Sequence, residues 1–106
     1  MQTIENINKS IKENSALMLY FSAPTCGVCQ VLKPKLTQAL HENFPAFHVE
    51  TVDISVDEDI APHFSVYAIP TILIFLDGKE FLRKSRNMSV DEVIREIQRP
   101  YEIMCS

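Results

Sequence analysis

The sequence is poor in the residues that mark specialised protein classes. Its 106 residues include no tryptophan, only two glycines and only three cysteines, and the longest unbroken apolar run, residues 16–21, has six residues. Such a run is too short to span a membrane, and three cysteines do not form the disulfide framework of a small secreted protein. A net charge of −4, with ten basic residues spread thinly, argues against nucleic acid. We therefore expect neither a membrane nor a nucleic-acid partner.

The remaining composition is that of a single globular domain. Apolar residues make up 46% of the chain and charged residues 23%, and a chain of this length buries a core without metals or disulfides. No repeat, linker or low-complexity segment divides the sequence, so we predict one domain over residues 1–106. The first residues show no basic segment followed by an apolar stretch. We therefore expect no signal peptide and a cytosolic, that is cytoplasmic, protein.

The spacing of apolar residues predicts alternating helices and strands. The predicted strands are the segments 16–21, 47–53, 71–76 and 81–85, and the last two are joined by an Asp77-Gly78 turn. The predicted helices begin after Thr3, after Thr25, at Asp57 and after Ser89, where Glu92 completes a capping box. A strand, a helix and a strand in succession imply two parallel strands. The fold class is α/β, with a four-stranded mixed sheet flanked by helices.

Two cysteines stand three residues apart, in Cys26-Gly27-Val28-Cys29, between a predicted strand and a predicted helix. At this spacing two helical cysteines lie one turn apart, close enough for a disulfide. With Thr25 as the N-cap, free amides and the helix dipole are expected to lower the pKa of the Cys26 thiol. We predict that Cys26 attacks a substrate disulfide and that Cys29 resolves the mixed disulfide. Gly27 would leave room for the substrate chain.

Other interpretations of the cysteines stay open. Cys26 and Cys29 could be an inert buried pair, or a zinc site if two distant ligands joined them. No two histidines share a helix face or a ligand spacing, so we expect no metal site and surface positions for His41, His48 and His63. Cys105 is expected to be an incidental exposed thiol, with a disulfide-linked dimer or a regulatory thiol as the alternatives. A monomer is favoured over a dimer.

Beyond the cysteine motif, the chain resembles the thioredoxin family from about Ala16 to the final helix. The matching residues are Phe21, Ala23, Cys26-Gly27, Cys29, Pro34, Asp53, Ile69-Pro70-Thr71 and Asp77-Gly78. The resemblance implies the thioredoxin fold, a cis Pro70 facing the cysteines, and a substrate strand that pairs with the backbone of Ile69. It also implies disulfide-containing protein substrates bound around Thr25, Gly27, Val28, Ile69 and Pro70, an electron-donor reductase, and no cofactor.

The chain departs from the family pattern around the cysteines. Thr25 stands in place of the usual Trp, Val28 in place of Pro, and Gln30 in place of Lys or Arg. The family's buried acid and its lysine partner align with Tyr20 and Thr51. Because the pKa of tyrosine is near 10, no obvious general base remains. The chain also begins later than the family does, so the first edge strand of the fold is expected to be missing.

Two functions therefore compete. The first is a cytosolic thiol–disulfide oxidoreductase that reduces or exchanges protein disulfides. The second is a thioredoxin-fold binding module, redox-inactive or redox-sensing, for a specific protein partner. Retention of both cysteines favours the first function, whereas loss of the Trp, the acid and the lysine favours the second.

Overall fold

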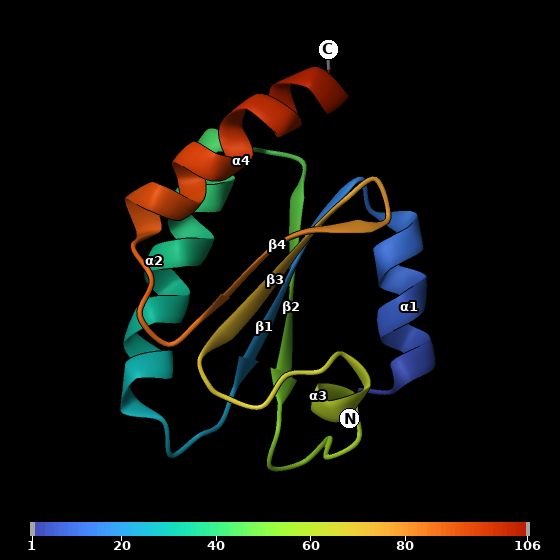
Figure 1. Cartoon of the computed structure of the whole chain (residues 1–106), viewed down its shortest axis with the longest axis vertical. Coiled ribbons are helices and arrows are strands. Elements are labelled where there is room, and N and C mark those ends of the chain that lie inside the picture. Colours follow the sequence, from blue (N-terminus) through green and yellow to red (C-terminus); the bar gives the residue numbers. More distant parts are fainter. Residues whose placement is uncertain (1, 106) are drawn as a thin grey trace.

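Helices and strands alternate along the chain in the computed structural model, which describes residues 2–105 (Figure 1). In order they are α1 (Ile4–Glu13), β1 (Ala16–Ser22), α2 (Gly27–Asn43), β2 (Phe47–Asp53), α3 (Ile60–His63), β3 (Thr71–Leu76), β4 (Lys79–Ser85) and α4 (Val90–Met104). The strands form one sheet in the order β2-β1-β3-β4, with β1 parallel to β2 and the other neighbours antiparallel. Within the described residues no strand precedes α1. The predicted four-stranded mixed sheet is confirmed.

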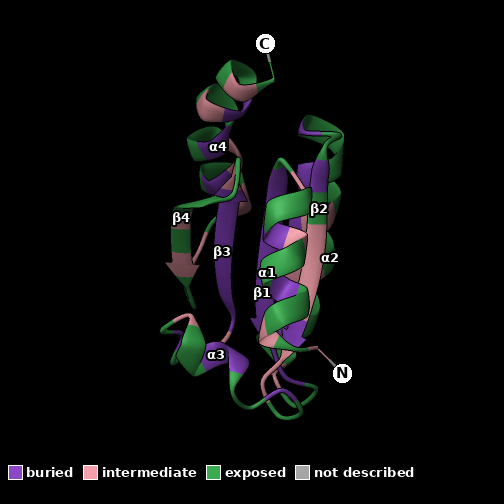
Figure 2. Ribbon diagram, turned by 90° about the vertical axis from the view of Figure 1, so that its right-hand side faces the viewer, coloured by how far each residue is buried: buried purple, intermediate pink, exposed green. Residues whose placement is uncertain are grey.

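Strand β1 is buried along its whole length, and its side chains contribute to two hydrophobic cores, one on each face of the sheet (Figure 2). Because side chains alternate across a strand, Met18 and Tyr20 pack with α2 and α4, whereas Leu17, Leu19 and Phe21 pack with α1 and α3. The helices therefore cover the sheet from both sides, α2 and α4 on one face and α1 and α3 on the other (Figure 1).

The register of β1 against β3 decides where the cysteines lie. These strands are antiparallel, and Phe21, near the end of β1, is paired with Thr71, the first residue of β3. The segment that leaves β1 and the segment that enters β3 therefore meet at one end of the sheet. Cys26 follows the first segment and Pro70 ends the second, so the pairing of the two strands brings them to the same end.

The third helix is shorter than predicted. Its expected start was Asp57, but α3 begins only at Ile60. The Asp57 N–H donates to the Asp53 carbonyl at 2.9 Å, and the buried Asp57 carboxylate accepts the N–H of Gln2 at 3.2 Å. Asp57 is thus held in a turn by contacts on both sides, and the helix starts after it.

The last helix continues through Pro100 to Met104. The aromatic ring of Tyr101 lies 4.7 Å from that of Phe44, between centroids, and its hydroxyl accepts the N–H of Ala46 at 3.0 Å. These contacts fasten the final turn to the body of the protein even though a proline inside a helix removes one backbone hydrogen bond. Cys105 is therefore the exposed C-cap of α4 and not part of a loose tail.

The predicted capping box of α4 is only half formed. The Ser89 hydroxyl accepts the Glu92 N–H at 3.3 Å, as predicted. The Glu92 carboxylate does not return the bond, because it pairs with the Lys84 ammonium at 3.1 Å. Lys84 also reaches Glu96, at 3.2 Å, and so links β4 to two turns of α4.

Arg83 ties β4 to the segment that follows α3. Its guanidinium donates to the carbonyls of Phe64 and Ser65 at 2.8 and 2.9 Å and pairs with Glu80 at 3.0 Å. Arginine at the carboxyl end of a helix satisfies carbonyls that have no partner within the helix. Arg83 and Lys84 thus both make specific structural contacts.

The two glycines differ in backbone conformation, because Gly78 has a positive φ and Gly27 does not. Asp77 and Gly78 have φ angles of +54° and +81°, the tight hairpin turn that the sequence predicted. This turn pairs Lys79 with Leu76, so β4 begins two residues before its predicted start. Gly27 has no positive φ, and a Cβ there would meet nothing within 4 Å. The positive φ thus favours glycine at position 78, whereas the backbone at position 27 does not require it.

We expect Gly78→Ala to lower the free energy of unfolding by about 1 kcal/mol, because an L side chain is strained at positive φ. Gly27→Ala is the matched control and should cause no loss, since alanine is a better helix former and meets open space. Urea unfolding of both oxidised variants measures the difference. An equal loss in the two variants would contradict this account of the turn.

Candidate active site

Cys26 and Cys29 are joined by a disulfide at the start of α2, with their Cα atoms 5.3 Å apart. The two sulfurs differ in accessibility, because Cys29 is 1% exposed and Cys26 is half-buried. An incoming substrate therefore reaches Cys26 first. The inert pair weighed from the sequence would need both sulfurs hidden, and only one of them is.

Cys26, and not Thr25, is the N-cap of α2. Its sulfur accepts the backbone N–H of Cys29 at 3.2 Å, and Thr25 lies exposed outside the helix. The predicted cap is wrong by one residue, and the correction strengthens the chemistry. A sulfur at the cap position faces the free amides of the first turn directly, and those amides stabilise negative charge.

The turn that leads into α2 is closed by the carbonyl of Ala23. This oxygen accepts the Cys26 N–H at 3.0 Å and the side-chain amide of Gln30 at 3.1 Å. Gln30 takes the place of a basic residue in the family pattern, and its contact with Ala23 was not foreseen from the sequence. The two bonds fix the approach to the helix and, with it, the position of the sulfur.

The Ile69–Pro70 peptide bond is cis, as the resemblance implied. The loop is held on both sides, because the Pro70 carbonyl accepts the Arg86 N–H at 2.7 Å and the Thr71 hydroxyl donates to the Ala68 carbonyl at 2.6 Å. Among the described residues, nothing forms a hydrogen bond with the backbone N–H or C=O of Ile69. A fixed loop thus presents unpaired backbone groups at the end of the sheet where the cysteines lie.

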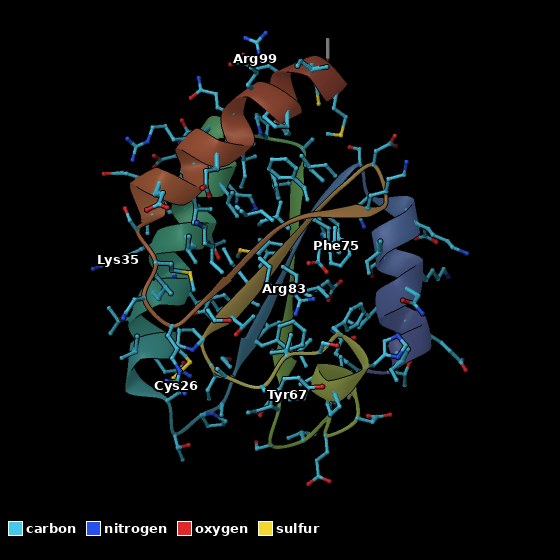
Figure 3. All side chains as sticks on the ribbon, viewed as in Figure 1. Cys26, Lys35, Tyr67, Phe75, Arg83 and Arg99 are labelled. Carbon is cyan, nitrogen blue, oxygen red and sulfur yellow. A yellow bond between two sulfur atoms is a disulfide. The ribbon has the colours of Figure 1, made fainter. Side chains whose placement is uncertain are left out.

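Exposed apolar residues surround this end of the sheet. Val28, which was predicted to bind substrate, is 64% exposed, and Val31, one turn further along α2, is 58% exposed. Tyr67, just before the cis-proline loop, is 82% exposed and was missed by the sequence analysis. Figure 3 shows Cys26 and Tyr67 at one end of the molecule and Arg99 at the other. Solvated apolar groups beside a reactive sulfur suit contact with another protein.

Two open grooves flank the loop. The first, of about 470 Å³, lies between α2 and the β4–α4 connection and includes Val28, Leu32 and Met88. The second, of about 450 Å³, lies between α3 and the loop and includes Tyr67 and Ile69. Val28 and Ile69, which were predicted to bind substrate, thus border different grooves, and both grooves include Arg86.

Tyr20 occupies the place of the family's buried acid. Its hydroxyl donates to the Cys29 carbonyl at 2.9 Å, and its register partner on β2 is Thr51. Burial raises the pKa of Tyr20 to about 12. The phenol therefore stays protonated at neutral pH, which confirms that this position supplies no general base. It supplies a neutral hydrogen bond to the backbone of the deeper cysteine.

Within residues 2–105, no three His, Cys, Asp or Glu side chains come close enough to hold a metal ion. The three histidines are exposed, and His48 pairs with Glu50 at 2.8 Å. None of the helices described is long and apolar enough to cross a membrane.

Comparison with known proteins gives a consistent result. Residues 1–99 match the family model described as Thioredoxin. The chain is 30% identical over 105 residues to thioredoxin-like protein YdfQ of Bacillus subtilis, covering 97% of this chain and 91% of that protein. It is 36% identical over 95 residues to a thioredoxin of Chlamydia trachomatis, covering 90% and 91%. Some other relatives are longer, and this chain spans less than half of their length.

Solved structures agree with the sequence relatives. Oxidised mitochondrial thioredoxin 3 of Saccharomyces cerevisiae superposes with a TM-score of 0.80 at 26% identity, covering 92% of this chain and 90% of that one. Its sheet and flanking helices therefore match those described above.

We expect Tyr20→Phe to lower the free energy of unfolding by about 1 kcal/mol at pH 8, through loss of the hydrogen bond to Cys29. The pKa of Tyr20 is about 12 in the folded protein, against about 10 unfolded. The advantage of wild type over the variant is therefore complete below about pH 10 and declines as the pH rises towards 12. Urea unfolding of both proteins at pH 8 and pH 11 measures it. A difference that stays constant between these pH values would contradict the assignment.

Proposed function

The chain belongs to the thioredoxin family and is a thiol–disulfide oxidoreductase, and from that premise we propose that it reduces or exchanges disulfides of protein substrates, with Cys26 as the nucleophile and Cys29 as the resolving thiol. One observation carries the assignment of roles. The half-buried sulfur of Cys26 caps α2 and accepts an amide, whereas Cys29 lies buried one turn deeper. The accessible sulfur is thus also the one whose negative charge the helix stabilises.

The proposed reaction begins with the reduced protein. The Cys26 thiolate attacks one sulfur of the substrate disulfide, a mixed disulfide forms, and the first substrate thiolate leaves and takes a proton. Cys29 then loses its proton and attacks the Cys26 sulfur, which releases the second substrate thiolate. Two electrons pass from the protein dithiol to the substrate, and the protein is left with the Cys26–Cys29 disulfide.

The proton of Cys29 needs an acceptor other than Tyr20, whose raised pKa keeps it protonated. We assign this role to the departing substrate thiolate. A thiolate with an ordinary pKa near 8.5 is a far better base than water, and it is released next to Cys29 as the mixed disulfide forms. Substrate and resolving thiol would thus exchange the proton directly.

The substrate segment is proposed to lie extended along the cis-proline loop. The backbone groups of Ile69 have no partner within the described chain, so they can pair with a passing strand. Gly27 offers no side chain on the approach to Cys26, while Thr25 and Val28 are exposed beside it. Support for this orientation comes from the register that brings Pro70 and Cys26 to one end of the sheet.

A complete cycle requires that electrons return to the disulfide. We propose that a reductase supplies them, and that the protein works as a monomer in the cytosol. The exposed thiol of Cys105 supports a reducing compartment, because a free surface cysteine is prone to oxidation elsewhere. The altered residue Thr25 next to Cys26 supports a reductase other than the usual donor of the family.

The competing binding-module function is favoured by one observation, the replacement of the buried acid by Tyr20. A module of this kind would bind a partner without turning over. Catalysis with a general substrate separates the two functions.

Trapping with single cysteine variants tests the assigned roles. In a Cys105→Ser background, reduced Cys29→Ser is expected to accumulate a mixed disulfide with native, disulfide-bonded insulin, because no resolving thiol remains. Cys26→Ser should accumulate none, since its remaining sulfur is buried. Mass spectrometry of quenched reactions counts the adducts. Accumulation by Cys26→Ser alone would reverse the roles.

The protein with both cysteines should accelerate insulin reduction by dithiothreitol by at least about tenfold over dithiothreitol alone, and each single variant should lose this acceleration. Titration of the Cys26 thiolate by absorbance near 240 nm gives an independent reading of the helix-terminal effect. No acceleration by the intact protein would favour the binding module.

A further inference from the structure

One unpaired cation borders both grooves beside the cis-proline loop. Arg86, the first residue after β4, lines the groove that contains Val28 and also the groove that contains Ile69. Its side chain is exposed, and within residues 2–105 the guanidinium makes no hydrogen bond or ion pair. The two preceding cations, Arg83 and Lys84, are both occupied by carboxylates. Arg83 and Lys84 therefore connect parts of the fold through their side chains, whereas the Arg86 side chain makes no such connection within residues 2–105.

Arg86 also has an unusual backbone conformation for a residue with a side chain. Its φ is +58°, in the left-handed region where glycine is the favoured residue. Its N–H donates to the Pro70 carbonyl at 2.7 Å, so the residue is held next to the loop. A bulkier residue that keeps an unfavourable conformation, and whose side chain makes no hydrogen bond or ion pair within residues 2–105, points to a use outside folding.

We propose that Arg86 is a specificity-determining residue that selects substrate segments with an acidic side chain one or two residues from the attacked cysteine. The inference rests on the proposed function, because it requires a substrate strand along Ile69. Residues of an extended strand follow one another at about 3.5 Å, so a neighbour of the attacked cysteine passes beside the loop to which Arg86 is bonded. A guanidinium binds a carboxylate through two parallel hydrogen bonds.

The charges around Arg86 indicate which groove receives the acidic side chain. The groove beside Val28 contains two cations, Lys84 and Arg86, against one carboxylate, Glu92. The groove beside Ile69 contains Arg86 against Glu58. Lys84 is already paired with Glu92 and Glu96, so Arg86 is the cation that stays available in the first groove. The second groove also contains Glu58, whose carboxylate has no ion pair within residues 2–105 and would repel a substrate carboxylate. We place the substrate carboxylate in the first groove, next to Val28.

Charge-matched peptides test this inference. Three disulfide-linked peptide dimers are used, identical except that the residue on each side of the cysteine is Asp, Asn or Lys. The fully reduced protein is mixed with each peptide, the reaction is quenched with acid, and chromatography gives the second-order rate constant. Each constant is divided by the corresponding constant for dithiothreitol, which removes the intrinsic reactivity of each peptide.

For the wild type we expect the Asp peptide to react about fivefold faster than the Lys peptide. The Arg86 guanidinium attracts the Asp carboxylate and repels the Lys ammonium, and a factor of this size fits charges at an exposed site. Arg86→Gln should reduce this ratio to about one, and Arg86→Glu should invert it. The preference should also shrink in 0.5 M NaCl, because exposed charges are screened. Because the Asp-peptide rate constant is divided by the Lys-peptide rate constant, a general loss of activity in an Arg86 variant does not change the result.

Arg99→Gln is the matched control, because it removes the same charge at the opposite end of the molecule (Figure 3). It should keep the fivefold ratio. Equal rates with the three peptides, or an equal fall in the ratio for Arg99→Gln, would overturn the inference while leaving the proposed function intact. Failure of the wild type to reduce any of the peptides would overturn the proposed function and this inference together.

Discussion

The burial of β1 between two neighbouring strands and two layers of helices is the constraint on which the rest of the structure depends. Every residue of this strand is buried, and its side chains enter both cores. A shift of β1 by one residue would exchange its two faces, so its register against β3 is strongly fixed. That register brings Phe21 opposite Thr71, and the Cys26 turn and the Pro70 loop are consequently placed together.

The site built on this framework consists largely of backbone groups. Amides at the start of α2 face the Cys26 sulfur, the Ala23 carbonyl closes the turn before it, and the Pro70 carbonyl fixes the facing loop. Backbone groups do not change when side chains do. This explains how the chain keeps the geometry of the cysteine pair while Thr25, Val28 and Gln30 all differ from the family pattern.

The sequence was sufficient for features that depend on local composition. The apolar runs located β1 and β3, and Asp77-Gly78 located the hairpin. The start of α3 was less predictable, because it depends on a partner distant in sequence: the Asp57 carboxylate accepts the N–H of Gln2. The predicted cap of α2 was wrong by one residue because of a local contact. The Cys26 N–H donates to the Ala23 carbonyl, and this turn leaves Thr25 outside the helix.

In the candidate site, too, some features could be predicted from the sequence and others depend on the folded structure. The two cysteines followed from their spacing and position, and cis Pro70 followed only from the family resemblance. Val28 and Val31 fit the apolar periodicity of α2 and are nevertheless exposed, because periodicity identifies one face of a helix but not which part of that face another element covers. Arg86 could not be singled out, since its left-handed backbone and its position between two grooves arise only when β4 has returned beside Pro70.

The site carries its charge on the surface and not beneath the cysteines. On the inside, a neutral Tyr20 replaces a buried acid, which removes the cost of desolvating a charge beneath the cysteines. On the outside, Arg86 keeps a free charge at the rim of the grooves. Buried charge acts on the proton that Cys29 must lose, whereas exposed charge acts on the approach and fit of a partner. The chain thus leaves proton transfer to the substrate thiolate and places its electrostatic selectivity on the surface that meets the substrate.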